Sequence, residues 1–305
     1  MYTYSGGEYG LRKYTGIYPA LITPFKRGSG DLDLDRLEVL LELLLKTGIR
    51  GVLVNGTTGE APHLTREERI STIRLAKNLC GDDKLVIAGV GGLSLKETIA
   101  YSMDAANEGV DALLISPPYY YKPSATALLE YYMQLKRKCK IPILLYNIPK
   151  LTGVEIPVDV IYKLVDGERV IGIKDSSCDM HYLMNIIYKI KGRGLIFCGC
   201  DAIIYQALAS GADGAILASA NLIPKEIVSI YALMQRGKFD DAYKIYMEIY
   251  PILDVVSKYG VVAVKRGFEC MGIDMGISRE PLNIYRDLPA DELDRIKTLL
   301  ATKWL

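Results

Sequence analysis

The sequence predicts an α/β fold, a (β/α)8 TIM barrel followed by a C-terminal helical extension. Short apolar runs alternate with longer amphipathic stretches from about residue 16 to residue 237. The apolar runs are nearly continuous in Ile, Val and Leu, which is typical of strands buried on both faces of a parallel sheet. Eight strand–helix units over about 220 residues favour a closed barrel, although the count alone also allows an open doubly wound sheet.

The predicted strands follow one another at spacings that leave room for a helix after each. They are Gly16–Thr23, Arg50–Asn55, Lys84–Val90, Asp111–Ser116, Pro142–Asn147, Val170–Lys174, Gly194–Gly199 and Asp213–Ala218.

The stretches between these strands have the three- and four-residue apolar spacing of helices. The first carries leucines from Leu34 to Leu45, and Gly48 follows as a stop signal. Thr65-x-x-Glu68 and Ser94-x-x-Glu97 have the spacing of capping boxes and open the next two helices. The later helices are predicted to begin near Ser124, Pro157, Asp179, Ala202 and Pro224.

The chain changes character after Gly237. Lys238–Lys258, Val261–Met271 and Asp291–Leu300 have helical patterns with no strand between them. We therefore predict a barrel catalytic domain over residues 1–237 and a helical extension over residues 238–305. No Pro/Ser-rich linker separates the two, so the extension is expected to pack on the barrel.

Composition and charge limit the class of protein. The 305 residues are 50% hydrophobic and 24% charged, with mean hydropathy +0.14, as in ordinary globular proteins. The balance of 37 basic and 36 acidic residues argues against nucleic acid as a partner. No apolar stretch reaches the ~18 residues of a membrane span, and residues 1–11 lack the apolar core of a secretory signal. We expect a soluble, cytoplasmic protein without a membrane partner.

Cysteine and histidine content argues against metal and disulfide chemistry. The six cysteines are scattered and too sparse for a disulfide scaffold, so we interpret them as small buried hydrophobic side chains. With only His63 and His181, a multi-histidine metal centre and a Ser-His-Asp triad are both disfavoured. The cysteines are Cys80, Cys139, Cys178, Cys198, Cys200 and Cys270.

Candidate catalytic residues follow the strands, because a barrel of this type carries its active site at their carboxyl ends. Lys174 ends the sixth apolar strand. A desolvated lysine has a lowered pKa and its free amine forms Schiff bases with carbonyl groups. The structural alternatives are a lysine that extends to the rim and one that pairs with Asp175.

The second and fifth strands end in hydroxyl groups. Thr57 and Thr58, in the GTTGE segment, offer hydroxyls and backbone N–H groups to a carboxylate or phosphate, or form a plain turn. Tyr146 is a candidate acid/base group, or a core residue. Together with Lys174 they meet the needs of 2-oxo acid chemistry: an iminium electron sink, a carboxylate site and a proton carrier.

Four segments and their spacing carry a family resemblance. They are GTTGEAPHLTREER at residues 56–69, PPYYYKP at 117–123, LLYNIPKLTG at 144–153 and VIGIKDSS at 170–177. The chain resembles the dihydrodipicolinate synthase / N-acetylneuraminate lyase family of class I aldolases from residue 16 to about 237. A weaker likeness continues through GISREPL at 276–282.

The resemblance implies a role for each matching residue. Lys174 would form the Schiff base with pyruvate or another 2-oxo acid, and Tyr146 would shuttle protons. Thr57 and Tyr120 would link Tyr146 to solvent, with Tyr120 reaching in from a neighbouring subunit. Thr58 would bind the substrate carboxylate.

The resemblance also implies backbone contacts and an assembly. Gly199 and the main chain at Ile216 lie where relatives place backbone contacts to the substrate. The family is usually a homotetramer that needs no metal or organic cofactor.

Leu151 points to the branch of the family. Synthases that condense pyruvate with aspartate semialdehyde resemble YNxPxRTG, and Leu151 stands in the arginine's place. An aliphatic side chain cannot pair with a carboxylate, which favours a neutral, polyhydroxylated substrate tail. Sialic-acid lyases typically carry serine at the position of Thr57. PPYYYKP and the GCD segment at 199–201 resemble the 2-keto-3-deoxygluconate aldolases.

Two polar residues are candidates for binding the substrate's hydroxyl groups. Asp201 is the first, with Ser219 as a second. The structural alternative for Asp201 is the N-cap of the following helix.

The expected function is reversible cleavage of a 2-keto-3-deoxy sugar acid to pyruvate and an aldehyde. Within the family, the alternatives are 4-hydroxy-tetrahydrodipicolinate (dihydrodipicolinate) synthase and a 2-oxo acid dehydratase. From another class, a non-catalytic barrel that binds 2-oxo acids would have no need of a nucleophilic lysine. A phosphate-binding barrel enzyme would want a Gly-rich loop after its last two strands, and residues 218–220 offer little of that.

Overall fold

Eight parallel strands form the centre of the molecule in the computed structural model, which describes residues 8–282 and 288–303. Around the sheet they follow the order β1-β8-β7-β6-β5-β4-β3-β2. Between β1 and β2 the ring is closed by two bonds, from Arg50 N–H to Ile17 O (2.9 Å) and from Leu21 N–H to Leu53 O (2.9 Å). The predicted (β/α)8 barrel is confirmed. The strands are β1 (Gly16–Pro19), β2 (Gly51–Val54), β3 (Leu85–Gly89), β4 (Ala112–Ile115), β5 (Ile143–Asn147), β6 (Val170–Asp175), β7 (Leu195–Cys198) and β8 (Gly214–Leu217).

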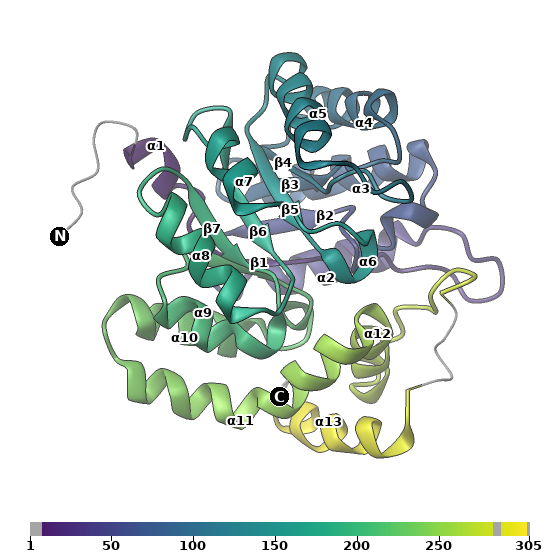
Figure 1. The fold of residues 1–305 in the computed structure, drawn as a ribbon. Helices are drawn as coiled ribbons and strands as arrows, with labels where there is room; N and C mark the ends of the chain where they lie inside the picture. Colours follow the sequence, from purple (N-terminus) through teal and green to yellow (C-terminus); the bar gives the residue numbers. More distant parts are fainter. Residues whose placement is uncertain (1–7, 283–287, 304–305) are drawn as a thin grey trace.

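Helices surround the barrel (Figure 1), and all but α1 and α6, which the sequence did not predict, fall close to the predicted positions. The α-helices are α1 (Glu8–Arg12), α2 (Leu34–Leu45), α3 (Arg66–Cys80), α4 (Leu95–Asn107), α5 (Ala125–Lys138), α6 (Pro149–Thr152), α7 (Val158–Leu164), α8 (Met180–Ile190), α9 (Ile204–Ala209), α10 (Pro224–Gln235), α11 (Phe239–Tyr259), α12 (Val261–Cys270) and α13 (Ala290–Lys303). Three 3₁₀ turns, η1 (Ala61–His63), η2 (Asp201–Ile203) and η3 (Ser219–Asn221), are the next elements after β2, β7 and β8.

The strands are buried on both faces, which explains their continuous apolar sequences. One cluster fills the barrel and includes Tyr18, Tyr146, Phe197 and Ile216. A larger cluster lies between the strands and the helices and includes the leucine stripe of α2. Because the interior of such a barrel is packed rather than open, a ligand site has to lie at an end of it.

The predicted helix starts are formed by local side-chain bonds. At α3 the capping box is complete, since Thr65 accepts from Glu68 N–H and the Glu68 carboxylate accepts from Thr65 N–H. At α4, Ser94 caps Glu97 N–H in the same way, but the Glu97 carboxylate accepts from Leu93 N–H instead (2.7 Å). This shift by one residue places the glutamate on the loop that leaves β3.

The last helices, α11, α12 and α13, lie together on one side of the barrel (Figure 1). Their predicted positions are confirmed, whereas the division of the chain at residue 237 into two domains stays a prediction. None of the helices in the described ranges is both long and apolar enough to cross a bilayer.

Candidate active site

Lys174 and Tyr146 stand side by side at the carboxyl end of the barrel. They are register partners on β6 and β5, so the pairing of the strands sets their spacing. The Lys174 side chain is 4% exposed, and its Nζ lies 4.5 Å from the centroid of the Tyr146 ring. A buried amine next to a phenol, with no carboxylate in direct contact in the described structure, is suited to attack on a carbonyl group.

Asp175 does not pair with Lys174, because other groups hold its carboxylate. It accepts hydrogen bonds from Asn147 Nδ2 (2.8 Å) and Ser177 Oγ (2.8 Å). Burial raises the pKa of Asp175, and these bonds act in the opposite direction. The Asn147–Asp175 pair fastens the ends of β5 and β6 together. The bond between Asn147 and Asp175 was not predicted from the sequence, although both residues lie in the motifs that carry the family resemblance.

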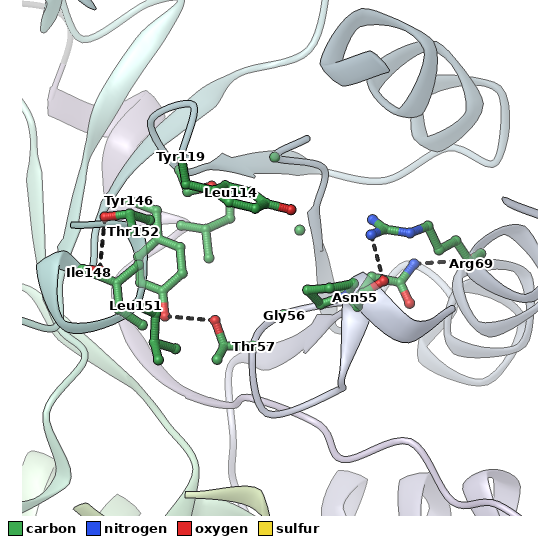
Figure 2. Close-up of a pocket in the computed structure, with 15 residues that line it drawn as sticks. Asn55, Gly56, Thr57, Arg69, Leu114, Tyr119, Tyr146, Ile148, Leu151 and Thr152 are labelled. Atoms are coloured by element: carbon green, nitrogen blue, oxygen red, sulfur yellow. Dashed lines mark hydrogen bonds between the residues drawn. The ribbon is translucent and has the colours of Figure 1, made fainter. Parts of the chain in front are cut away.

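Thr57 contacts Tyr146 across the mouth of the barrel, as Figure 2 shows. Its Oγ1 is 3.3 Å from the Tyr146 hydroxyl oxygen. The turn that carries it is closed by bonds from Gly59 N–H to Gly56 O (3.1 Å) and from Glu60 N–H to Thr57 O (3.0 Å). Thr58 is half-buried beside it. In the described part of the chain, the N–H groups of Thr57 and Thr58 have no acceptor, so this turn leaves donors for an anion.

A cavity of about 150 Å³ opens beside these residues. Thr57, Tyr146 and Leu151 line one side of it, and Arg69 lies at the other (Figure 2). Leu151 is 61% exposed, so it presents an apolar surface to whatever enters. The wall also includes Tyr119 of the PPYYYKP loop.

Arg69 is a cavity residue that the sequence analysis did not single out. Its Nη2 donates to Ala61 O (2.6 Å), and its guanidinium group lies 4.3 Å from the centroid of the Tyr101 ring. Burial lowers the pKa of Arg69. Arg69 belongs to the charged REER segment of α3, which is typical of an exposed helix surface, so the sequence does not indicate that Arg69 faces the cavity.

Gly199 lies directly against Lys174. A Cβ atom at this position would come within 2.6 Å of Lys174 Cε and 2.1 Å of Ser176 Oγ. The Gly199 carbonyl accepts from Ser176 Oγ (3.0 Å). Ile216, on β8, points its side chain into the same interior cluster as Tyr146. A larger residue at position 199 would therefore displace Ser176 and the end of the Lys174 side chain.

Asp201 and Ser219 meet where β7 and β8 end. Both are buried, and Asp201 Oδ1 accepts from Ser219 N–H (2.8 Å). The Asp201 side chain does not cap η2 or α9, the helices that follow it in the chain, so the alternative that it is the N-cap of the following helix is wrong. Burial raises the pKa of Asp201, and the charge of Lys174 lowers it. The carboxyl group is therefore within electrostatic reach of the lysine.

Tyr120 is not brought to Tyr146 within one chain. Its side chain is 85% exposed and meets the Tyr121 ring edge-on, with centroids 5.0 Å apart. Its φ of 80° lies in the left-handed region, which is costly for a bulky residue. The backbone therefore directs this side chain outward.

The cysteine interpretation is wrong for two residues. Cys178 and Cys200 form a disulfide, with Cα atoms 5.4 Å apart, between the loops that follow β6 and β7. The loops are adjacent because their strands are neighbours, and chain spacing alone does not reveal this. Three of the remaining cysteines are buried as predicted, and one is half-buried: Cys80, Cys139 and Cys198, with Cys270.

Removing this disulfide should lower stability. The crosslink spans a separation of 22 residues, and restricting the unfolded chain over such a loop contributes about 3 kcal/mol. We expect Cys178→Ser to lower the free energy of unfolding in urea by that order, and dithiothreitol to lower the wild type equally. Cys270→Ser is the control. Equal urea midpoints for wild type and Cys178→Ser without reductant would show that the crosslink does not stabilise the fold.

Comparisons with known proteins agree with this geometry. The model of the dihydrodipicolinate synthetase family matches residues 13–300. A protein described as an uncharacterized DapA-like lyase, from Pyrobaculum arsenaticum, is 34% identical, with 93% of this chain and 97% of the relative covered. A 4-hydroxy-tetrahydrodipicolinate synthase from Thermosipho africanus is 32% identical, with 92% and 94% covered.

Solved structures show the same similarity. The 4-hydroxy-tetrahydrodipicolinate synthase of Methylacidiphilum fumariolicum superposes with TM-score 0.89 at 32% identity, covering 95% of each chain. The dihydrodipicolinate synthase of Aquifex aeolicus gives TM-score 0.88 at 30% identity, covering 95% of this chain and 98% of that one. The chain therefore belongs to the dihydrodipicolinate synthetase family, whose members are pyruvate-dependent lyases and synthases.

Proposed function

We propose that this enzyme reversibly cleaves a 2-keto-3-deoxy sugar acid to pyruvate and an aldehyde, with Lys174 as the Schiff-base lysine. The observation that carries the proposal is the pair formed by buried Lys174 and Tyr146, next to a cavity whose rim presents Leu151. The pair supports imine chemistry. Leu151 supports a substrate tail without a carboxylate, since an aliphatic side chain provides no hydrogen bond or ion pair to compensate for the dehydration of an anion.

The reaction follows from these positions. The free amine of Lys174 adds to the C2 carbonyl, and the Tyr146 phenol gives its proton to the departing hydroxyl, so that water leaves, an iminium ion forms and Tyr146 is left as a phenolate. Tyr146 takes the proton of the C4 hydroxyl, the C3–C4 bond breaks, and its electron pair moves to the iminium nitrogen as the aldehyde departs. The enamine then takes a proton at C3, and water releases pyruvate and the free lysine.

The other polar groups have roles consistent with this scheme. The free N–H groups of Thr57 and Thr58 would hold the substrate carboxylate, and Thr57 Oγ1 would hand protons to Tyr146 at 3.3 Å. Asp201 and Ser219 would meet substrate hydroxyls, and the backbone at Gly199 and Ile216 would complete the wall.

Tyr120 enters the proposal through assembly. It is exposed at the tip of a tyrosine-rich loop and lies away from the Tyr146 of its own chain. We propose a homotetramer in which Tyr120 of each chain completes the proton path of a neighbour. The oligomeric state in solution, measured by light scattering, tests this directly.

The synthase reaction is the second candidate, because several relatives carry that name. It would need a cation for the carboxylate of aspartate semialdehyde, which is the second carboxylate in the site besides that of pyruvate. Leu151 occupies the matching position, and Arg69, on the opposite side of the cavity, donates to Ala61 O and stacks on Tyr101. Arg69 is thus a cation of the cavity, but it lies opposite Leu151, the position at which the resemblance places the arginine of the synthases.

Borohydride trapping with pyruvate tests the mechanism. We expect the intact mass to rise by one reduced pyruvate imine per chain, and peptide mapping to find it on Lys174. The disulfide of the pyruvate-treated and the untreated protein is fully reduced before mass spectrometry, so that its state does not alter the mass. No adduct, under conditions where a known family member is trapped, would overturn the proposal in favour of a barrel that only binds 2-oxo acids.

The aldehyde is tested next, with Leu151→Arg as the informative variant. Wild type should condense pyruvate with glyceraldehyde and discriminate against aspartate semialdehyde. The arginine should change the ratio of the kcat/KM values for aspartate semialdehyde and glyceraldehyde by about 10- to 100-fold in favour of aspartate semialdehyde. A change of this size corresponds to one charge-assisted hydrogen bond. Leu151→Gln, polar but neutral, is the matched control. A wild type that already prefers aspartate semialdehyde would establish the synthase instead.

A further inference from the structure

A buried ion pair connects the far end of the chain to the Thr57 turn. Lys265 Nζ, on α12, lies 2.7 Å from Glu60 Oε1, and both side chains are 0% exposed. The lysine also donates to Ile277 O (3.2 Å). Removing two charges from water costs several kcal/mol of desolvation free energy for each ion, and replacing such a pair by apolar residues of similar volume often leaves the protein equally or more stable. Fold stability alone is therefore a poor explanation for this pair.

Glu60 occupies an unusual position in the backbone. Its φ of 54° is left-handed, and its N–H closes the turn by donating to Thr57 O. The second carboxylate oxygen of Glu60 accepts from the backbone N–H of Arg279 (2.9 Å). The side chain is thus held from both sides by segments more than 200 residues away, while its own backbone shapes the residues that face Tyr146.

Arg279 fastens the same assembly to the start of α3. It donates to Glu68 Oε2 (2.7 Å) and to His63 O (2.8 Å), and its guanidinium group lies over the Phe25 ring. The bond from Arg279 lowers the pKa of Glu68, while burial lowers the pKa of Lys265 and Glu60 opposes that shift. We refer to Glu60, Lys265 and Arg279 as the Glu60 clamp.

We infer that the Glu60 clamp is a positioning device for the reaction: it holds the GTTGE turn so that Thr57 meets the Tyr146 hydroxyl and the free N–H groups face the substrate carboxylate. Among the described residues, no hydrogen bond or ion pair joins Glu60 or Lys265 to Tyr146 or Lys174, so they act through the turn. The inference rests on the proposed function. It gives the C-terminal helices a role in catalysis in addition to packing on the barrel.

The test replaces both charges at once, so that no unpaired charge is left buried. Glu60→Gln with Lys265→Met keeps side-chain volume and the acceptor for Arg279 N–H. We expect pyruvate KM to rise about tenfold and kcat to fall about 10- to 100-fold, since small displacements of catalytic groups have effects of this size. Assays are run well below the melting temperature of every variant.

A matched control makes the same chemical change elsewhere. Lys77 and Asp111 form an ion pair (3.1 Å) at the start of β4, the opposite end of the barrel. Both residues are half-buried, and Lys77→Met with Asp111→Asn should leave KM and kcat within about twofold of wild type, because the pair lies away from the site. A merely structural clamp would reduce the folded fraction, which lowers kcat per total protein and leaves KM unchanged.

Arg279→Gln keeps the test decisive if the double variant does not fold. Arg279 is half-buried. The variant keeps the backbone N–H that donates a hydrogen bond to the Glu60 carboxylate, and it loses the side-chain bonds to Glu68 and His63. We expect a smaller rise in pyruvate KM in the same direction. Unchanged KM in every folded clamp variant would overturn the inference. Failure of wild type to trap pyruvate would instead overturn the proposed function, so the two failures are distinct.

Discussion

We expect Lys174→Arg to abolish covalent capture of pyruvate and to lower kcat/KM by at least about four orders of magnitude, as removal of a covalent nucleophile does in other enzymes. Arginine keeps the positive charge and much of the length, but its guanidinium group stays protonated and cannot add to a ketone. The change therefore removes the chemistry while disturbing the packing of β6 as little as any substitution that ends nucleophilic attack.

The measurement combines borohydride trapping with steady-state rates. Lys122→Arg, on the exposed PPYYYKP loop, is the matched control and should keep both the adduct and the rate. Lys265, equally buried but paired with Glu60, serves as an internal control in the peptide map, since it should carry no label. An adduct that persists in Lys174→Arg would place the imine on another lysine and refute the assignment.

The second large effect is expected for Tyr146→Phe. Removing the hydroxyl leaves the ring beside Lys174 but removes the group that moves the proton, which costs about 10²- to 10⁴-fold in kcat. Imine formation with pyruvate should slow and still reach completion on long incubation, because Lys174 retains its place on β6. Thr57→Val, which removes the 3.3 Å contact, should have a smaller effect in the same direction.

Tyr18→Phe is the control for this variant. Tyr18 is also a barrel-interior tyrosine, but its hydroxyl donates to Tyr14 O (2.7 Å) near the amino end of β1. It should lose about 1 kcal/mol of stability and keep its rate. Rates within threefold of each other for Tyr146→Phe and wild type would exclude Tyr146 as the proton carrier.

The barrel could be predicted because its determinants are local. Strands buried on both faces read as apolar runs, and a complete capping box at Thr65 and Glu68 marks a helix start within four residues. Lys174 and Tyr146 could be paired for the same reason: each ends a strand, and strand ends of a parallel barrel meet at one rim.

What could not be predicted depends on pairs that are distant in the sequence. Cys178 and Cys200 are brought together by neighbouring loops, and Glu60 and Lys265 are separated by 205 residues. Lys265 stands in an apolar stretch of α12, which signals burial but names no partner. The direction of Tyr120 depends on one left-handed backbone angle, which no side-chain pattern encodes.

The contact between Gly199 and Lys174 constrains how this chain can change over time. The lysine reaches its place because residue 199 has no side chain, and the smallest addition there would collide with Lys174 Cε. Lys174 lies on β6 and Gly199 directly after β7, 25 residues apart in the chain, and a side chain at position 199 would require Ser176 and Lys174 to move. Alanine at position 199 is thus expected to displace the end of the Lys174 side chain, and with it the atom that forms the imine, while the barrel keeps its shape.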